Sequence, residues 1–459
     1  MISQGDAEQI HETSLRLLAD PGVRLEHERV CGLLLKAGAG PGMGAHTVRL
    51  PAEMVADAVA RAPSEVWFAD RAGGGYSITP RMDGFRVWST PGMNIEKGGK
   101  VRPFGRADMA AYTRLLGRLP RVDGVFGMSL ADAPPPSADV IGLQTMAANT
   151  TKHIRVLCAS PASAGIMCCM KSVLGDMPWF SIGFTAHGPL RWTHLALEIF
   201  VRTAGHGIPT TINGEPMAGA SGPVTLAGAA AVGNAEILAG LVVNQLLEPG
   251  RPCVYNLGLA HVMDMRTGEA VTGGPENHLL AGISAAMGQF YNLPSCSWVS
   301  TEAMLPDAQA ALEKSLGWKT HLDAGVGLIW GVGQLESELT VSPAMAWIDH
   351  EILTYIERLQ RGVVVDRETL AEEVTRSVGI AGEFLSHEHT FQHFRRELYE
   401  PQLLWRGKRE TWERDGGRPL ADRAQEHVSG LMQPLDEPLL SDDETDELSR
   451  LAAAVPEDT

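Results

Sequence analysis

Short β-prone segments alternate with longer helical patterns through the middle of this chain. The β-prone segments cover residues 85–90, 123–129, 153–160, 179–186, 209–213, 253–258, 295–301 and 326–331. Helical patterns lie between them, at residues 106–118, 137–149, 162–173, 191–205, 223–247, 274–290 and 306–318, and another begins near Met345. A strand and a helix with their loops take roughly 30 residues in a βα unit. Eight such units in a row predict an α/β protein built as a (β/α)8 TIM barrel.

Helical patterns also flank this repeating region. Apolar residues at the helical period predict N-terminal helices over 7–20, 25–37 and 51–61, followed by a β-rich stretch over 65–105. Further helices are expected over 345–361, 367–377, 388–400 and 403–414. We therefore expect an N-terminal helical and β extension (1–84), the barrel (85–345), a C-terminal helical region packing on the barrel (346–432) and an acidic tail (433–459) that is mobile or a loosely docked helix. The first barrel strand is the least defined, because residues 85–104 also fit a hairpin.

The composition suits a soluble enzyme and disfavours some partners. The chain has 459 residues and a formal net charge of −17, which argues against nucleic acid and anionic membranes and also suits a cationic substrate. Its six cysteines form no C-x-x-C pair and no basic, apolar leader opens the chain, so we expect reduced thiols and a cytoplasmic location. The most apolar window, Leu226 to Leu247, is interrupted by Asn234, Glu236 and Asn244 and therefore predicts a buried helix.

Polar side chains recur where the predicted strands end. In a TIM barrel the carboxyl ends of the strands meet at one face, and that face carries the catalytic groups. The residues at these ends are Thr90, Asn94, Glu96, Ser129, Ser160, His187, Asn213, Glu215, Asn256, Trp298, Ser300, Glu302, Trp330 and Gln334. Loop capping is the ordinary role of such residues, so the set is a stronger indication of a site than any one member. No G-x-S-x-G elbow and no P-loop accompanies them, which leaves acyl transfer and nucleotide chemistry without support.

Two of the ten tryptophans, Trp298 and Trp330, fall at predicted strand ends. Indole faces attract quaternary ammonium groups by cation–π interaction, worth about 0.5–2 kcal/mol each. Together with Glu215 or Glu302, these rings could form a box around a permanent cation. Packing in the core is the alternative role of each ring.

A dense histidine cluster, HEHTFQHFR, lies at residues 387–395. His389 and His393 share one helix face, a spacing that can bind a metal, but no H-E-x-x-H motif is present and we expect no metal site. We interpret the segment as folding over the barrel mouth or forming a subunit contact. A metal-dependent hydrolase using this cluster remains an alternative function.

Several longer stretches resemble one family of proteins. They are HETSLRLLADPGVRLEHE near the start, NTTKHIRV at 149–156, residues 218–255, MDMRTGEAVTGGPENHLL at 263–280, LPDAQAALEK at 305–314 and EFLSHEHTFQHFRREL at 383–398. Their order and spacing resemble the trimethylamine methyltransferase (MttB-like) family over roughly residues 5–430. The resemblance implies a (β/α)8 barrel that holds no cofactor permanently and presents its substrate to the cobalamin cobalt of a separate corrinoid protein.

The resemblance also bears on the substrate. Archaeal trimethylamine enzymes of this family carry pyrrolysine at the position near Ser300, and its absence here resembles the non-pyrrolysine branch, which includes glycine betaine methyltransferases. A quaternary ammonium departs as a neutral amine, so its reaction needs only orientation and desolvation.

We therefore expect a methyltransferase that moves a methyl group from a quaternary amine, glycine betaine first, to Co(I) of a corrinoid-binding partner. The expected catalytic residues are Glu302, Asn213 and Glu215. The expected substrate-binding residues are Trp298, Trp330, Asn256, His187, Ser300, Gln334, His387 and His389. A non-catalytic protein that binds betaine or another quaternary ammonium on the same barrel is the alternative. We also expect a homo-oligomer with no nucleic-acid or membrane partner.

Overall fold

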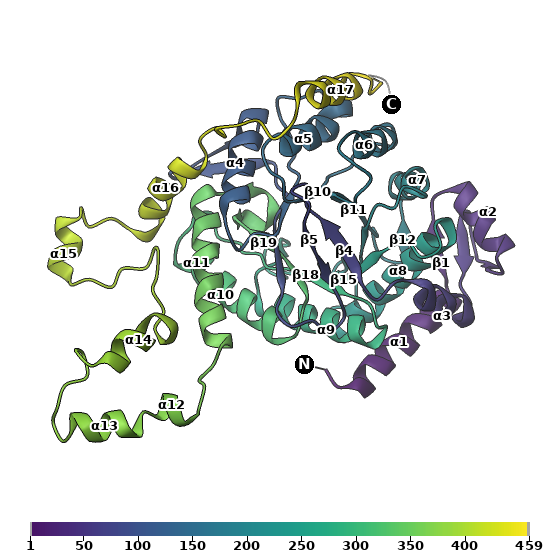
Figure 1. Ribbon diagram of the computed structural model, residues 1–459. Helices are drawn as coiled ribbons and strands as arrows, with labels where there is room; N and C mark the ends of the chain where they lie inside the picture. Colours follow the sequence, from purple (N-terminus) through teal and green to yellow (C-terminus); the bar gives the residue numbers. More distant parts are fainter. Residues whose placement is uncertain (1, 457–459) are drawn as a thin grey trace.

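A computed structural model describes residues 2–456 and shows a closed barrel of eight parallel strands (Figure 1). In chain order the strands are β6 (Arg86–Ser89), β9 (Gly124–Phe126), β10 (His153–Arg155), β11 (Phe180–Thr185), β13 (Thr210–Asn213), β15 (Cys253–Gly258), β18 (Ser295–Trp298) and β19 (Leu328–Val332). Each strand overlaps a segment predicted as a strand, and β19 pairs with β6 to close the ring. The predicted TIM barrel is therefore confirmed.

The intervening helices cover the outer face of the barrel. They are α4 (Arg106–Arg118), α5 (Ala138–Ala147), α6 (Pro161–Val173), α7 (His194–Thr203), α8 (Leu226–Leu247), α9 (Pro275–Phe290), α10 (Ala308–Asp323) and α11 (Pro343–Gln360). With helices outside and side chains inside, the strands are buried on both faces and need no polar alternation. A Cβ at Gly240 would lie 2.4 Å from Trp192 and 2.7 Å from Ile212, so glycine is what lets α8 lie this close to β13.

The N-terminal helices α1 (Gln4–Ala19), α2 (Glu28–Lys36) and α3 (Ala52–Arg61) all pack on α8. A small sheet joins this extension to the barrel and consists of β12 (Arg191–Trp192), β1 (Val23–Leu25), β3 (Thr47–Arg49) and β2 (Gly40–Pro41). Within residues 2–456, α8 is the one helix long and apolar enough to cross a membrane, and most of it is buried inside the fold.

A β-hairpin closes the amino end of the barrel. Its strands are β4 (Val66–Ala69) and β5 (Gly75–Ile78). The backbone N–H groups of Ala69 and Arg71 donate to the carbonyls of Pro178 and Thr151, which lie just ahead of β11 and β10. Phe68 packs edge-on against Trp88 inside the barrel, with ring centroids 5.1 Å apart. Because this end is filled, a small molecule must enter from the carboxyl end.

Two small sheets flank the carboxyl end and form the walls of a mouth. One contains β14 (Met217–Ala218), β16 (His261–Met263) and β17 (Ala270–Val271), from the loops after β13 and β15. The other contains β20 (Gln334–Leu335), β21 (Thr340–Val341), β7 (Asn94–Lys97) and β8 (Lys100–Pro103), from the loops after β19 and β6. The ambiguity over residues 85–104 is thereby resolved, because β6 belongs to the barrel and the hairpin β7–β8 follows it.

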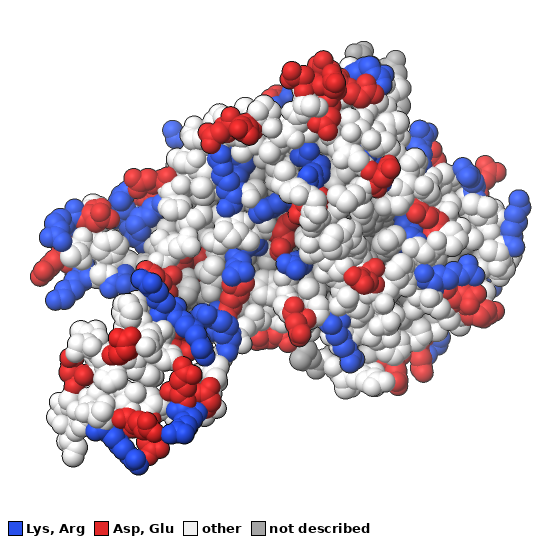
Figure 2. Space-filling model, in the orientation of Figure 1, with Lys and Arg blue, Asp and Glu red and all other residues white. Residues whose placement is uncertain are grey.

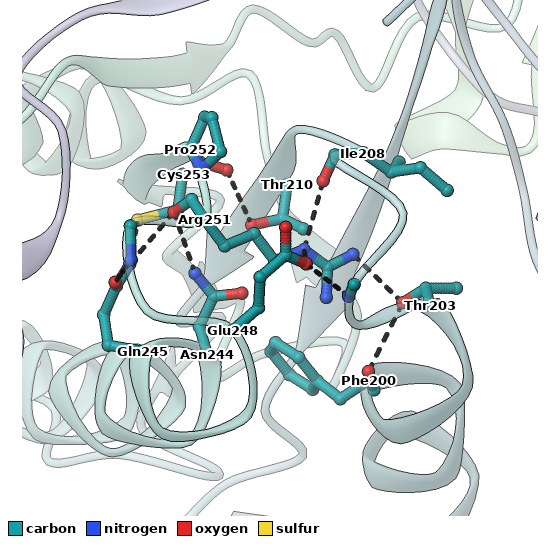
Figure 3. Close-up of polar contacts among 12 residues, drawn as sticks. Phe200, Thr203, Ile208, Thr210, Asn244, Gln245, Glu248, Arg251, Pro252 and Cys253 are labelled. Atoms are coloured by element: carbon teal, nitrogen blue, oxygen red, sulfur yellow. Dashed lines mark hydrogen bonds and ion pairs between the residues drawn. The ribbon is translucent and has the colours of Figure 1, made fainter. Parts of the chain in front are cut away.

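A buried arginine fixes the amino ends of β13 and β15 (Figure 3). Arg251 donates through Nε to the Ile208 carbonyl (3.1 Å) and through Nη2 to Thr203 Oγ1 (3.0 Å). It also pairs with Glu248 (3.5 Å), while its own carbonyl accepts from Gln245 (2.9 Å). Burial lowers the pKa of the guanidinium to about 10. The cluster ties α7 and α8 to two strands at the end away from the mouth, so its role is structural.

After α11 the chain leaves the body as a projection, which we call the arm (residues 361–398). It carries α12 (Arg367–Leu370), α13 (Glu372–Val378) and α14 (Glu388–Glu397), and Figure 1 shows these helices standing apart from the barrel. The single helix predicted over 367–377 is broken at Ala371, whose φ of 48° is left-handed. The helix predicted over 403–414 begins only at Arg409 (α15, Arg409–Arg414).

The chain then returns to the body. α16 (Leu420–Leu431) packs on α11 and α4, and α17 (Asp442–Ala453) packs on α6 and α5. Leu448 and Leu451 of α17 are buried in this contact. Of the two states expected for the acidic tail, the docked helix is therefore the one observed up to residue 456, and residues 457–459 lie outside the described part of the chain.

Candidate active site

Side chains from three neighbouring strands form a hydrogen-bonded row at the carboxyl end of the barrel. Asn213, at the end of β13, donates through Nδ2 to Thr185 Oγ1 of β11 (3.0 Å). Asn256 of β15 donates through Nδ2 to Asn213 Oδ1 (2.9 Å), and its own Oδ1 accepts from the Gly258 N–H (3.1 Å). Both amides are buried. The row holds them in one orientation and leaves each Nδ2 a second hydrogen that could be donated to a ligand.

Glu302 links two loops of the mouth. Its Oε1 accepts from the backbone N–H groups of Thr272 (2.6 Å) and Gly273 (2.8 Å) and from the Thr272 hydroxyl (2.8 Å). The hydroxyl of Ser337 lies 3.4 Å from the same oxygen. The buried Ser300 Oγ lies 2.7 Å from Thr272 Oγ1. Glu302 and Ser300 therefore hold the loop after β17 against the loop after β20, and direct contact of either with a substrate stays a prediction.

The loop after β20 has a strained backbone. Three consecutive residues, Glu336, Ser337 and Glu338, have φ values of 54°, 47° and 84°. The left-handed conformation costs a non-glycine residue about 1–2 kcal/mol. The backbone N–H groups of Glu336 and Ser337 donate to the carbonyls of Ala303 and Thr301, both at 3.0 Å, and so enforce it. Strain of this kind clusters at functional sites, where the surrounding structure pays for a particular side-chain placement.

Three carboxyl groups at this end of the barrel lack a basic partner. Burial, and then the charges of Glu338 and Glu236, raise the pKa of Glu215 to about 8. Burial raises the pKa of Glu338 to about 7, and that of Glu236 to about 7 although Glu236 accepts a backbone hydrogen bond from Leu190 (2.8 Å). No basic side chain among residues 2–456 lowers any of these three pKa values. Glu236 is buried and the other two carboxyls are partly buried, and such groups without a counterion suit a cationic ligand.

Trp298 and Trp330 lie inside the barrel rather than at an open rim. With Trp88 they occupy one row of the strand register across β18, β19 and β6. Trp298 Nε1 donates to Gln334 Oε1. Trp330 stacks on Trp88 with centroids 6.1 Å apart, and the Arg155 guanidinium carbon lies 5.8 Å from its centroid. These rings form a floor that already contacts a side-chain cation, so their expected role as a cage for a substrate cation stays a prediction.

Trp330 Nε1 in this floor and two polar atoms beside the floor have no hydrogen-bond partner among residues 2–456. Gln334 Nε2 and Thr90 Oγ1 are buried and make no hydrogen bond with the described residues. They follow β19 and β6, which pair with each other. A buried polar atom left unpaired costs about 1–3 kcal/mol, so such atoms are typical of places where a ligand or water completes the bonding.

A buried ion pair supports the turn after β19. Lys314 Nζ lies 2.7 Å from Asp349 Oδ2, with both side chains fully buried, and it donates to the Gly331 carbonyl (2.6 Å). Asp349 also accepts from the Gly333 N–H (2.7 Å) and from Trp318 Nε1 (3.0 Å). Because both charges are fully hydrogen-bonded, the pair fixes the backbone that leads into β20.

The predicted histidines lie apart from this group. His187 is exposed after β11, with Nδ1 3.2 Å from the Thr185 carbonyl. His387 caps α14, and the His389 ring packs at a tilt against His393 with centroids 4.2 Å apart; both lie in the arm. The structure therefore joins some of the predicted residues by hydrogen bonds, Asn213 to Asn256 and Trp298 to Gln334, and places all three predicted histidines outside these contacts.

The arm also lies at the wrong end of the barrel to cover the mouth. Arg395 and Leu398 line a cavity together with Phe85 and Val326, which precede β6 and β19. The root of the arm is thus at the amino end of the strands. Folding of residues 387–395 over the mouth of their own chain, one of the two expected arrangements, is therefore wrong.

Two of the clustered carboxyls escape prediction from the sequence. From the sequence, Glu236 is interpreted only as a polar residue that interrupts an apolar helix. An acidic residue in such a helix is nevertheless itself a signal of function. Glu338 lies in an irregular segment beyond the last predicted strand, where periodicity gives no signal.

Residues 1–454 match the family described as trimethylamine methyltransferase (MTTB). The chain belongs to this family. An MTTB relative from Desulfitobacterium hafniense, a trimethylamine methyltransferase, is 32% identical over 92% of this chain and 87% of its own length. The trimethylamine methyltransferase of Methanosarcina barkeri is 27% identical over 96% of this chain and 93% of its own length. A glycine betaine methyltransferase from Desulfitobacterium hafniense is 25% identical over 90% of this chain and 88% of its own length.

The fold of this MTTB protein is shared with a solved structure. The monomethylamine methyltransferase of Methanosarcina barkeri superposes with a TM-score of 0.53, covering 94% of this chain and 88% of that chain, at 13% sequence identity. This likeness supports the barrel alone. The family and the relatives named for trimethylamine and for glycine betaine support methyl transfer as the class of chemistry of this protein.

Proposed function

We propose that this MTTB protein moves a methyl group from a quaternary amine, with glycine betaine as the first candidate, to Co(I) of the corrinoid held by a partner protein. The observation that carries the proposal is a set of three carboxyls that lack a basic partner among the described residues: Glu236, which is buried, and Glu215 and Glu338, which are partly buried. A fixed positive charge would favour the ionised form of these carboxyls and has no proton of its own to give up. That is the distinguishing property of a quaternary ammonium.

Methyl transfer from a quaternary amine requires few catalytic groups from the protein. Displacement at the methyl carbon breaks the C–N bond, the bonding pair stays on nitrogen, and the amine leaves neutral, so no acid is needed. The corrinoid partner supplies the electron pair that forms the new bond to the methyl group. Glu215 and Glu338 would hold the ammonium, and the spare Nδ2 hydrogens of Asn213 and Asn256 would orient the rest of the molecule. Orientation and exclusion of water are then the protein's contribution.

Two unpaired atoms favour a betaine over trimethylamine. A betaine carries a carboxylate as well as an ammonium, and burying that carboxylate requires hydrogen-bond donors. Gln334 Nε2 and Thr90 Oγ1 are buried without a partner on adjacent strand ends and could both donate to it. Trimethylamine has no carboxylate, and in the protonated form that predominates at neutral pH it has no acceptor that would use them. We also propose a cytoplasmic location, which suits six cysteines that form no disulfide.

The test is an anaerobic reaction of the purified full chain with a Co(I) corrinoid protein and glycine betaine. We expect the corrinoid spectrum to change to that of the methylated form and dimethylglycine to appear in equal amount, with no change when trimethylamine replaces betaine. Glu215→Gln should slow the reaction by ~100-fold or more, as loss of a group that stabilises charge does. The matched control, Glu269→Gln on an exposed loop, should react normally.

Two outcomes would count against the proposal. Absence of product with betaine and with every other quaternary amine would refute methyl transfer from this substrate class. Tight betaine binding without any product would favour the non-catalytic binding protein instead.

A further inference from the structure

Arg155, at the end of β10, is a buried cation without an anionic partner. The residue is 5% exposed, and no acidic side chain among residues 2–456 raises the pKa of its guanidinium, which burial lowers to about 9. The buried cations Arg251 and Lys314, by contrast, each lie beside a carboxylate. On the surface, too, Figure 2 shows acidic and basic side chains interspersed. Burying a charge alone is unfavourable, so Arg155 indicates an anion that arrives with a ligand.

The guanidinium of Arg155 has hydrogen-bond donors to spare. Nη1 donates to the Val156 carbonyl and Nη2 donates to Thr211 Oγ1 (3.3 Å), whereas Nε has no partner among the described residues. A guanidinium has five N–H bonds arranged as a planar fork, and these contacts use two of them. The fork matches the two oxygens of a carboxylate, which can accept two parallel hydrogen bonds from it.

Neighbouring strands hold this fork in place inside the barrel. A Cβ at Gly183 of β11 would lie 1.6 Å from Arg155 Nη2 and 2.4 Å from Thr211 Oγ1. Glycine at this position is therefore what lets the guanidinium cross β11 and reach β13. The guanidinium carbon also lies 4.9 Å from the centroid of the Phe126 ring and 5.8 Å from that of Trp330. The sequence thus builds a defined position for a charge that the described chain does not itself neutralise.

The other unpaired atoms of the floor are donors as well. Trp330 Nε1 and Gln334 Nε2 can only donate, and the Thr90 hydroxyl can donate or accept. Gln334 is tied to the floor because its Oε1 accepts from Trp298 Nε1. Thr90 follows Trp88 by two residues, the spacing that returns a side chain to the same face of a strand. A bare quaternary ammonium has no acceptor for such donors, whereas an anion can accept from all of them.

The charged groups are also ordered along the barrel. Thr211, which Arg155 contacts, precedes Asn213 by two residues on β13, so Asn213 stands about 7 Å nearer the mouth. Glu215 follows Asn213 beyond the end of the strand. The guanidinium therefore lies deep in the barrel, and Glu215 lies toward its opening. A molecule with an anionic end and a cationic end matches this order.

We propose that Arg155 binds the carboxylate of the substrate, and that this chain therefore selects a zwitterionic betaine over a quaternary amine that lacks a carboxylate. The inference rests on the proposed function for the ammonium end of the molecule. The carboxylate lies against the guanidinium and the unpaired donors of the floor, and the ammonium lies above it, near Glu215. This orientation turns the methyl groups toward the mouth, through which the corrinoid of the partner protein must approach.

The test is calorimetry on the full chain without a corrinoid, with glycine betaine and tetramethylammonium as paired ligands. Both ligands carry a quaternary ammonium, and only betaine carries a carboxylate. The native protein should bind betaine more tightly by ~100-fold or more, as expected for a buried and hydrogen-bonded charge pair. Arg155→Met should remove this difference by weakening betaine binding alone. Arg155→Lys keeps the charge but not the fork, so it should retain only part of the difference.

Arg251→Met serves as the control. It also replaces a buried arginine, but at the end of the barrel away from the mouth, and should leave the ratio of the two affinities unchanged. Circular dichroism checks that each variant is folded, which we expect for Arg155→Met because it removes an unpaired charge and keeps much of the side-chain volume.

Three results would each overturn the proposal. They are a native protein without a preference for betaine, an Arg155→Met protein that still prefers it, and an Arg155→Lys protein with the full native preference. The first comparison needs no variant, so it decides the question even if a variant fails to fold. A betaine-selective protein that forms no methylated corrinoid would contradict only the proposed function. Methyl transfer from betaine by a native protein that shows no such preference would contradict only the role of Arg155.

Discussion

Replacing Glu215 by glutamine should stabilise the free protein at alkaline pH. The glutamine has nearly the shape of the glutamic acid but cannot ionise, so the change removes a charge from a place where burial and two neighbouring carboxyls oppose it. The folded-state pKa of Glu215, about 8, lies above the ordinary value of 4.5. Below pH 4.5 the group is protonated in the folded and the unfolded chain, and it costs nothing. Between pH 4.5 and 8 only the unfolded chain ionises, so stability is lost as the pH rises.

The magnitude follows from the size of the pKa change. Each pKa unit corresponds to about 1.4 kcal/mol, so the rise from 4.5 to about 8 sets an upper limit of about 5 kcal/mol. Glu215 retains partial exposure, and water screens its charge, so we expect about 2 kcal/mol of stabilisation at pH 8. In a chain of this length that is a rise of roughly 2 °C in Tm.

Urea unfolding of the native and Glu215→Gln proteins at pH 4.5 and pH 8 measures this effect. The difference between the two proteins should be about 2 kcal/mol at pH 8 and close to zero at pH 4.5. Glu269→Gln, on an exposed loop, serves as the control and should change stability by less than about 0.5 kcal/mol at either pH. A Glu215→Gln effect that is equal at the two pH values, or a loss of stability at pH 8, would refute the reasoning.

Three further predictions concern the binding site and the supports of the barrel. Binding of a quaternary ammonium should tighten as the pH rises from 6 to 8, because the pKa values of Glu215 and Glu338 are about 8 and 7. The affinity should rise by up to about tenfold per pH unit for each proton displaced from these carboxyls. Calorimetry in buffers of different ionisation heat should detect the released protons, and an affinity that does not change with pH would contradict the carboxyl site. Arg251→Met removes the hydrogen bonds and ion pair that fix the amino ends of β13 and β15, and it should lower the free energy of unfolding in urea by about 3 kcal/mol. An unchanged unfolding midpoint would contradict this prediction. Lys314→Met leaves the buried Asp349 without its ion-pair partner and should lower the free energy of unfolding by about 3–5 kcal/mol. The double variant Lys314→Met/Asp349→Leu should recover most of that stability. Equal losses of stability in both variants would show that the charge of Asp349 is not the cause.

The barrel could be predicted because its pattern is local and repeated. Each strand is a short apolar run buried on both faces, each helix has its own period, and their alternation leaves few arrangements other than a closed parallel ring. The same logic places Asn213 and Asn256 side by side, since parallel strands that pair in register end at the same face. Their observed hydrogen bond follows from that register.

What the sequence by itself determined was therefore the order of the elements and the residues that stand at the strand ends. Only the tertiary structure decided which carboxyls meet there. Glu236 comes from a helix and Glu338 from a left-handed turn that bonds to distant carbonyls, and neither placement follows a local period. The raised pKa of Glu215 likewise depends on burial and on these neighbours, of which Glu338 lies more than a hundred residues away in the sequence. The projection of the arm has the same origin, because the helical period predicts helices over 367–377 and 388–400 but neither the break at Ala371 nor the position of these helices apart from the barrel.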